Sequence, residues 1–203
     1  MKKILILISI YFIECNILIS QVTTYKEDIK KFRSLNWKSL IADPRTTLQS
    51  KDSVFLDYYP IREKNKVYCS VELVSELQLI DMPTYSGKIK SFKKYALLHF
   101  NYKGRPLVLT AYQSVQNLTS PLYKDYLFIP FKDMTTNRST YGGGRYIDIK
   151  SSEIFNGHLL LDLNQVYNPW CAYSNGYNCP IPPKENTLTA ALKAGEKKFK
   201  KSH

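Results

Sequence analysis

Apolar and polar residues alternate along residues 95–112 in the pattern of a β-hairpin. With Lys103 and Gly104 as a two-residue turn, the flanking residues pair one to one. The pairs in this register are Tyr102 with Arg105, Phe100 with Leu107, Leu98 with Leu109, and Ala96 with Ala111. Six of these apolar side chains then share one face, which we expect to be buried. His99 lies on the other face beside Val108, where a solvated histidine is more common than a catalytic one.

Three further segments have strand patterns. Residues 67–74 alternate so that Cys69 lies on the apolar face, which indicates a buried thiol rather than a catalytic one. Residues 126–131 are apolar on both faces and predict an interior strand, with Pro130 at a bulge or at the strand end. Apolar residues alternate again over 188–192 and indicate a short last strand.

A second hairpin is predicted around the loop 151–157. Matching the apolar faces of 145–149 and 159–163 pairs Ile149 with Leu159, Ile147 with Leu161, and Arg145 with Leu163. The opposite face then carries Tyr146 against Asp162 and Gly144 against Asn164. This pairing brings the triple glycine 142–144, Asn164, Tyr167 and Asn168 to one end of the hairpin.

The N-terminal part has a helical pattern. Thr24 and Glu27 have the spacing of a capping box, and Tyr25, Ile29 and Phe32 recur at helical intervals, which predicts a helix over 25–35 that covers the sheet. Asp43-Pro44 should end any helical continuation. The expected fold class is therefore α+β, mainly β: an antiparallel barrel-like or sandwich-like sheet with an N-terminal helix.

The chain of 203 residues fits one domain, which we place at 21–199. Residues 1–20 resemble a signal peptide, with two lysines, an apolar run over 4–13 that is too short to span a bilayer, and cleavage near Ser20. We therefore expect export to a periplasmic or extracellular compartment, with no transmembrane span in the mature chain. Cys15 is a candidate for lipidation, but Glu14 before it favours plain export.

The net charge is +12, and removal of the signal would leave +11. This excess is compatible with a small anionic or envelope ligand, although the partner itself is not identified by the sequence. The lysines are scattered, and no basic stripe with interleaved aromatic residues is present, so a nucleic-acid groove is not expected. Residues 200–203 are expected to form a solvated basic tail.

Candidate chemistry concentrates between residues 141 and 186. Gly142, Gly143 and Gly144 lack the Lys-Ser or Lys-Thr of a phosphate loop, which favours a bulge or a close backbone approach. Arg145 would face the core, where a guanidinium needs a partner such as Asp133, Glu185 or Glu196. A structural ion pair is the favoured interpretation, and anion binding is the alternative.

An acid–base pair of a hydrolase would need two carboxylates in different environments. The candidates are Asp133, Asp148, Asp162 and Glu185. No nucleophile elbow and no His-Glu-x-x-His motif occurs, and three histidines make a histidine-rich metal centre improbable, so we expect neither a metal nor another cofactor.

Several motifs in the C-terminal half resemble a known family. They are YLFIPFKDMTT (126–136), TYGGGRYIDI (140–149), LLLDLNQVYNPWCAYSNGYNCPIPPKENTL (159–188) and AGEKKF (194–199). From about Leu97 to Phe199 they are similar to domain-of-unknown-function family 1684, with a weaker resemblance over 52–74. The resemblance implies a common fold and no assigned activity.

The spacing of the cysteines predicts one disulfide, between Cys171 and Cys179. An exported chain reaches an oxidising compartment, and Asn175-Gly176 can turn the loop back so that the two sulfurs meet. Two reduced thiols are the alternative. Cys69 should stay reduced.

The favoured function is an exported ligand-binding or interaction module of the cell envelope, and no catalytic signature indicates an enzyme. One alternative is a hydrolase that uses Asp162 or Glu185 with Asn164 and Arg145 as orienting groups. The other is a purely structural domain. The candidate ligand-binding residues are Gly142, Gly143, Gly144, Arg145, Asp162, Asn164, Tyr167, Asn168, Glu185 and Asn186.

Overall fold

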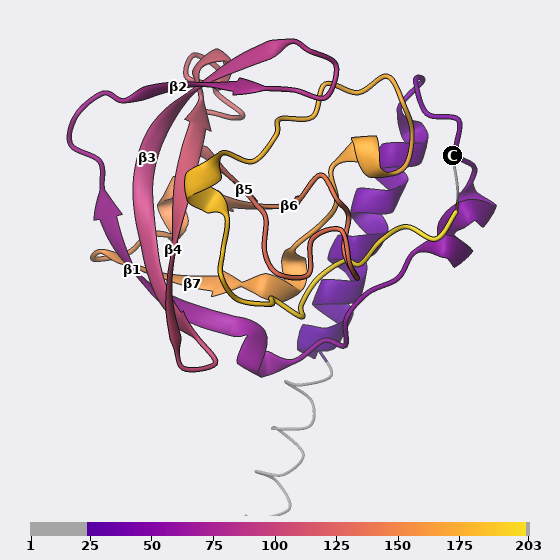
Figure 1. The fold of residues 1–203 in the computed structure, drawn as a ribbon, viewed down its shortest axis with the longest axis horizontal. Coiled ribbons are helices and arrows are strands. Elements are labelled where there is room, and N and C mark those ends of the chain that lie inside the picture. The colour runs from indigo at the N-terminus through magenta and orange to yellow at the C-terminus, as the bar shows by residue number, and fades with distance from the viewer. Residues whose placement is uncertain (1–23, 202–203) are drawn as a thin grey trace, which may run out of the picture.

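The computed structural model describes residues 24–201, in which one curled antiparallel sheet forms a half-barrel and a helix over 24–42 packs beside it (Figure 1). This arrangement confirms the expected mainly β fold with an N-terminal helix. The strands are β1 (Lys66–Leu73), β2 (Leu79–Pro83), β3 (Ile89–Tyr102), β4 (Arg105–Ser114), β5 (Tyr126–Phe131), β6 (Arg145–Lys150) and β7 (His158–Asp162). The short 3-10 helices are η1 (Ser50–Phe55), η2 (Glu63–Asn65), η3 (Val115–Asn117), η4 (Ser151–Glu153), η5 (Leu163–Gln165), η6 (Trp170–Ala172) and η7 (Lys184–Asn186).

The strand order is β6-β5-β4-β3-β1-β7, and β2 lies outside this order and pairs with the first part of β3. The hairpin of β3 and β4 has the predicted register throughout, from Tyr102 with Arg105 to Ala96 with Ala111. All six apolar side chains of that face are buried. Lys103 and Gly104 have φ angles of 53° and 79°, which is the left-handed geometry of a two-residue hairpin turn.

The predicted hairpin of residues 145–149 with 159–163 is wrong. β6 pairs with β5, whereas β7 pairs with β1, so the two strands occupy opposite edges of the sheet. Because the sheet curls, Ile147 and Leu161 still enter the same core although their strands are not paired. The partner of Tyr146 is Tyr167, which lies beyond β7 and forms an isolated antiparallel bridge.

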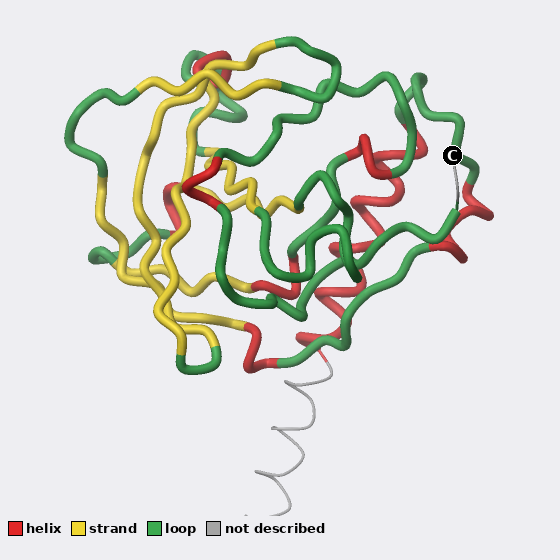
Figure 2. Tube along the Cα trace, viewed as in Figure 1, coloured by secondary structure: helices red, strands yellow, loops and turns green. Residues whose placement is uncertain are grey.

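The remaining strand predictions have mixed outcomes. β1 and β5 are confirmed, and β5 lies between β4 and β6 as an interior strand. The predicted strand at 188–192 is wrong, because this segment is irregular (Figure 2). Its apolar residues are nevertheless buried, and the core includes Leu188, Ala190 and Leu192. The segment therefore fills the open side of the half-barrel without joining the sheet.

The helix is longer than predicted, since it continues to residue 42 and stops directly before Asp43-Pro44. Its apolar face continues from Ile29 to Trp37 and Leu40, which are buried. The ring centroid of Trp37 lies 6.5 Å from that of Tyr173 and 6.2 Å from that of Phe199. The helix thus packs mainly against the loops that follow β7, and it covers one end of the sheet rather than lying flat on its face (Figure 1).

The basic C-terminal segment contacts the rest of the fold as far as Lys201, the last described residue. The backbone N–H of Lys200 donates to Phe55, the ammonium of Lys200 lies 3.0 Å from Asp57, and that of Lys201 lies 2.9 Å from Asp52. The interpretation of this segment as a solvated tail is therefore wrong for its described part. The predicted signal peptide, its cleavage site and Cys15 lie outside the described residues, as does the end of the tail.

Candidate functional site

The structure distributes the predicted site residues over four places instead of one. Gly142, Gly143, Gly144 and Arg145 lie at the start of β6, Asp162 and Asn164 follow β7, Glu185 and Asn186 belong to η7, and Tyr167 and Asn168 line a cavity beside the helix. The scatter follows from the strand order, because β6 and β7 are on opposite edges of the sheet.

Arg145 is a structural residue in this fold. Its Nη2 lies 3.1 Å from Asp133 Oδ2, and its remaining donors bond the carbonyls of Ala194, Glu196 and Leu192 at 2.6, 3.1 and 2.9 Å. The side chain is 1% exposed. This arrangement confirms the favoured ion pair and leaves the guanidinium no free surface for an anion.

The triple glycine allows backbone segments to approach closely. A Cβ at Gly144, whose φ is +94°, would lie 2.7 Å from the carbonyl oxygen of Phe131 and 2.7 Å from Pro182. A Cβ at Gly143 would collide with the rings of Tyr85 and Tyr141. These positions need glycine for packing, which agrees with the close approach favoured from the sequence.

Asp162 and Asn164 belong to a polar cluster that connects β7 to the helix. Asn164 Oδ1 accepts from Arg62 N and Asn65 Nδ2, both at 3.1 Å, and Asn164 Nδ2 donates to the hydroxyl of Tyr25 at 2.8 Å. That hydroxyl donates to Asp162 Oδ2, also at 2.8 Å. Both side chains are therefore occupied by contacts within the fold.

The two η7 residues lie against interior strands of the sheet, away from β7. Asn186 is fully buried, and its amide bonds Thr110 of β4 and Pro130 of β5. Glu185 accepts from the Tyr112 hydroxyl at 3.0 Å and contacts Lys94 at 3.3 Å. Glu185 and Asp162 thus do not converge on one substrate position.

Tyr167 and Asn168 line a cavity of about 300 Å³ between the helix and the sheet end. Asn168 is 1% exposed, and its Oδ1 is buried without a hydrogen-bond partner among residues 24–201. Aromatic side chains make up much of the wall. They are Phe32, Trp37, Tyr58, Tyr126, Tyr167, Trp170 and Tyr173.

Asp148 of β6 is a half-buried carboxylate in this wall, and one of its oxygens is free. Its Oδ2 accepts from the Tyr167 hydroxyl at 2.5 Å, while Oδ1 has no partner within the described part of the chain. Burial raises the pKa of Asp148 to about 6, and the bond from Tyr167 opposes the rise. A carboxylate of this kind can bind a donor or a cation, or exchange a proton near neutral pH.

Glu196 is the second buried carboxylate of the cavity wall, and both of its oxygens are bonded. Oε1 accepts from the Tyr173 hydroxyl, and Oε2 accepts from Asn168 N at 3.0 Å. Burial raises the pKa of Glu196 to about 7, against the effect of these bonds. Glu196 therefore fixes the two cavity residues that donate to it, and it has less freedom to act on a ligand than Asp148.

Comparison with known proteins gives a family and a fold. The model of the family described as Protein of unknown function (DUF1684) matches residues 54–197, more than half of the chain. The chain belongs to this family. The solution NMR structure of an uncharacterized protein of Haloarcula marismortui is similar, with a TM-score of 0.57 and 26% identity, covering 81% of this chain and 96% of that chain. No curated protein matches the chain.

The cavity extends beyond the part of the chain that the DUF1684 model matches. Thirteen of its lining residues lie within 54–197, and five come from the helix: Phe32, Asn36, Trp37, Ser39 and Leu40. Sequence reasoning missed this contribution because the predicted helix stopped at residue 35. The spacing of Trp37, Leu40 and Ile41 from Ile29 and Phe32 is the signal that could have extended it.

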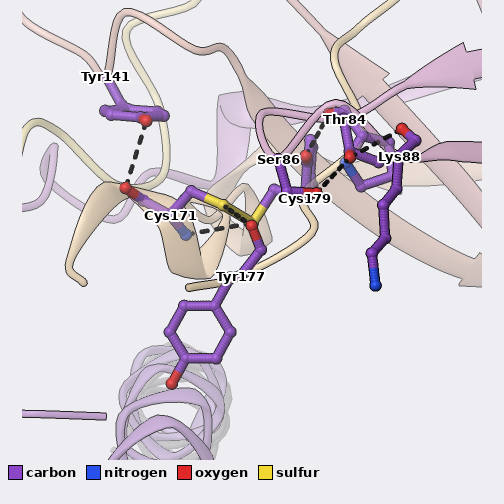
Figure 3. Close-up of a disulfide and its surroundings, with 9 residues drawn as sticks. Thr84, Ser86, Lys88, Tyr141, Cys171, Tyr177 and Cys179 are labelled. Atoms are coloured by element: carbon purple, nitrogen blue, oxygen red, sulfur yellow. Dashed lines mark hydrogen bonds between the residues drawn. A yellow bond between two sulfur atoms is a disulfide. The ribbon is translucent and has the colours of Figure 1, made fainter. Parts of the chain in front are cut away.

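The predicted disulfide joins Cys171 and Cys179 in the loop next to the cavity (Figure 3). Cys69 is free and buried. The Tyr141 hydroxyl donates to the carbonyl of Cys171 at 3.3 Å, so the loop is also tied to the segment before β6. Because Trp170 adjoins Cys171, the disulfide helps to hold one aromatic wall of the cavity.

Two features are absent from residues 24–201. No helix in this range is long and apolar enough to cross a membrane. No group of three or more His, Cys, Asp or Glu residues in the same range is arranged to hold a metal ion.

Proposed function

We propose that this protein is an exported ligand-binding module of the cell envelope, with its binding site in the cavity between the helix and the sheet end. The observation that carries the proposal is the combination of an aromatic wall with an unpaired carboxylate oxygen of Asp148. Ligand sites are concave and mostly apolar, and a few polar groups fix the orientation of the ligand. The cavity has these properties, and its volume of about 300 Å³ suits a small molecule.

Export is supported by the signal-like residues 1–20 and by the disulfide of Cys171 with Cys179. Disulfides persist in oxidising compartments and are rare in reducing ones. An envelope location would give the cavity access to small molecules outside the cytoplasm.

Acid–base catalysis is the second candidate function, because Asp148 and Glu196 border one cavity and both have raised pKa values. Hydrolysis by this pair would need both carboxylates to reach the substrate. Only Asp148 has an oxygen free of partners in the described chain, since both oxygens of Glu196 accept hydrogen bonds. This difference favours binding over hydrolysis.

The two tryptophans of the chain, Trp37 and Trp170, both line the cavity, so their fluorescence reports on its occupancy. A library of small cationic, neutral and anionic compounds should contain members that shift this fluorescence saturably. Asn36→Phe places a ring at a lining position and should abolish the response. Ser34→Phe, at an exposed position two residues away, is the matched control and should retain it.

If no compound shifts the fluorescence of the wild type, or if N36F responds as the wild type does, the cavity is not the binding site. If a compound is turned over, and if this turnover requires both Asp148 and Glu196, the catalytic function would replace the binding function.

A further inference from the structure

We propose that the ligand of this cavity carries an organic ammonium group, with Asp148 as its counterion and the aromatic side chains around its substituents. This inference rests on the proposed binding function and names the class of ligand. It depends on the charge balance of the cavity, on the unpaired oxygen of Asp148 and on the nature of the wall.

The charged groups of the cavity wall are predominantly acidic. They are Asp148, Glu153, Glu196 and Lys150, and Lys150 is exposed. One oxygen of Glu153 accepts from the backbone N–H of Lys150 at 2.7 Å. The helix contributes only uncharged residues to the wall, and Arg33 lies beside it with its guanidinium 4.2 Å from the centre of the Tyr58 ring. A cation entering the cavity therefore meets a surplus of carboxylates.

In the described part of the chain no cation forms an ion pair with Asp148. The helix, β5 and the loops after β7 take it partly out of water, and its one hydrogen bond comes from Tyr167. A desolvated carboxylate with one unpaired oxygen is costly to ionise. Burial is the main cause of its raised pKa, and no cation contributes a lowering. A bound ammonium would supply the missing opposite charge.

The wall offers the second kind of contact that an organic cation prefers. The faces of Trp and Tyr rings attract cations, and the attraction is stronger where water is excluded. The guanidinium of Arg33 already lies over the ring of Tyr58. Five other such rings border the cavity: Trp37, Tyr126, Tyr167, Trp170 and Tyr173. Alkyl groups on the ammonium nitrogen would also bury apolar surface against these rings.

Other ligand classes fit the cavity less well. An anion would have to approach three carboxylates with the exposed Lys150 as the one cation among the lining residues, because Arg145 is buried elsewhere in its pair with Asp133. A neutral polyol could donate hydrogen bonds to Asp148 but would leave its charge unpaired. The chain as a whole is basic, so preference for a cation must come from contacts in the cavity and not from long-range attraction.

The test compares choline with 3,3-dimethylbutan-1-ol, which has the same shape without the charge, and with glucose as a neutral polyol. Binding to the mature chain is measured at pH 8 by the fluorescence of Trp37 and Trp170. Choline should bind at least about tenfold more tightly than its neutral analogue, since one ion pair with cation–π contacts gives a preference of that order. Lowering the pH through about 6 should weaken the binding of choline, because Asp148 gains a proton.

Asp148→Asn should remove the part of the preference for choline that comes from the ion pair and leave only the part that comes from the rings, while the neutral analogue binds as before. Asp125→Asn is the matched control, because it removes one charge from an exposed neighbouring position outside the cavity wall and should leave the preference unchanged.

Equal or tighter binding of dimethylbutanol or glucose, blocked by N36F, would overturn the ammonium assignment and leave the proposed function intact. An unchanged preference in D148N would also overturn it. If no probe of any charge changes the fluorescence, both the assignment and the proposed function fail.

Discussion

Arg145 and Asp133 form an ion pair inside the half-barrel, with Nη2 and Oδ2 3.1 Å apart and side chains that are 1% and 0% exposed. The pair lies where β5 ends and β6 begins, and it connects this part of the sheet to a segment that the sheet does not hold. Asp133 Oδ2 also accepts from Leu192 N at 2.8 Å, and Arg145 bonds three carbonyls between residues 192 and 196. The irregular C-terminal segment is thus attached to the core by these two charges.

Replacing Arg145 by Met should therefore lower the free energy of unfolding by about 3–5 kcal/mol, because Asp133 would stay buried without its partner. Urea unfolding followed by circular dichroism measures the change. Arg45→Met is the matched control, since Arg45 pairs with Asp43 at an exposed position and its loss should change stability little. Equal effects of the two substitutions would contradict a structural role for the buried pair.

Asn164→Ala should destabilise the protein by about 3 kcal/mol, because the change leaves Arg62 N and Asn65 Nδ2 without their acceptor. Glu185→Ala should cost less than about 1 kcal/mol, since Glu185 is 37% exposed and water can replace its contacts with Tyr112 and Lys94. The same unfolding measurement compares the two variants. A loss at Glu185 as large as at Asn164 would favour the purely structural hypothesis for the whole motif.

The β3–β4 hairpin could be predicted to the residue because the information is local. A two-residue turn with positive φ at Lys103 and Gly104 fixes the register, and alternation then determines which side chains are buried. The Cys171–Cys179 pair was predictable for the same reason, since the two cysteines are eight positions apart in sequence.

The true partners of β6 and β7, which are β5 and β1, could not be predicted in this way. Alternation identifies a buried face but not the neighbouring strand, and in a curled sheet the inner faces of both edges meet in one core. The cavity depends on the same long-range geometry. Asp148 was recognised as a candidate carboxylate, but its place in one cavity wall with Trp37 and Glu196 follows only from how the helix packs on the sheet end.

Removing the disulfide with Cys171→Ser and Cys179→Ser should lower the free energy of unfolding by about 2.5 kcal/mol, the chain-entropy estimate for so short a loop. Alkylation of the unfolded chain beginning at residue 21 should label Cys69 alone without reductant, and all three cysteines with it. Three labelled cysteines without reductant would show that the bond is absent in the isolated protein.

The stability of the protein should fall as the pH rises from about 5 to 8. Burial raises the pKa of Glu196 from 4.5 to about 7 and that of Asp148 from 3.8 to about 6. For each group, the lower pKa is that of the unfolded state and the higher pKa is that of the folded state. At a pH between these two pKa values the folded state binds more protons than the unfolded state, so each rise in pH favours unfolding. The loss from Glu196 should be roughly 2–3 kcal/mol by pH 8. Carboxylates with lowered pKa, such as Asp57, act at more acidic pH and do not mask this trend.

Urea unfolding at pH 5, 6, 7 and 8 measures the slope, and Glu196→Gln should remove most of it, because glutamine keeps an acceptor for Asn168 or Tyr173 without a charge to ionise. Glu76→Gln, at an exposed position, should leave the slope unchanged. A wild-type stability that stays constant or rises over this range would mean that Glu196 is already ionised in the folded protein at pH 5, which would require water or a cation to reach it through the cavity.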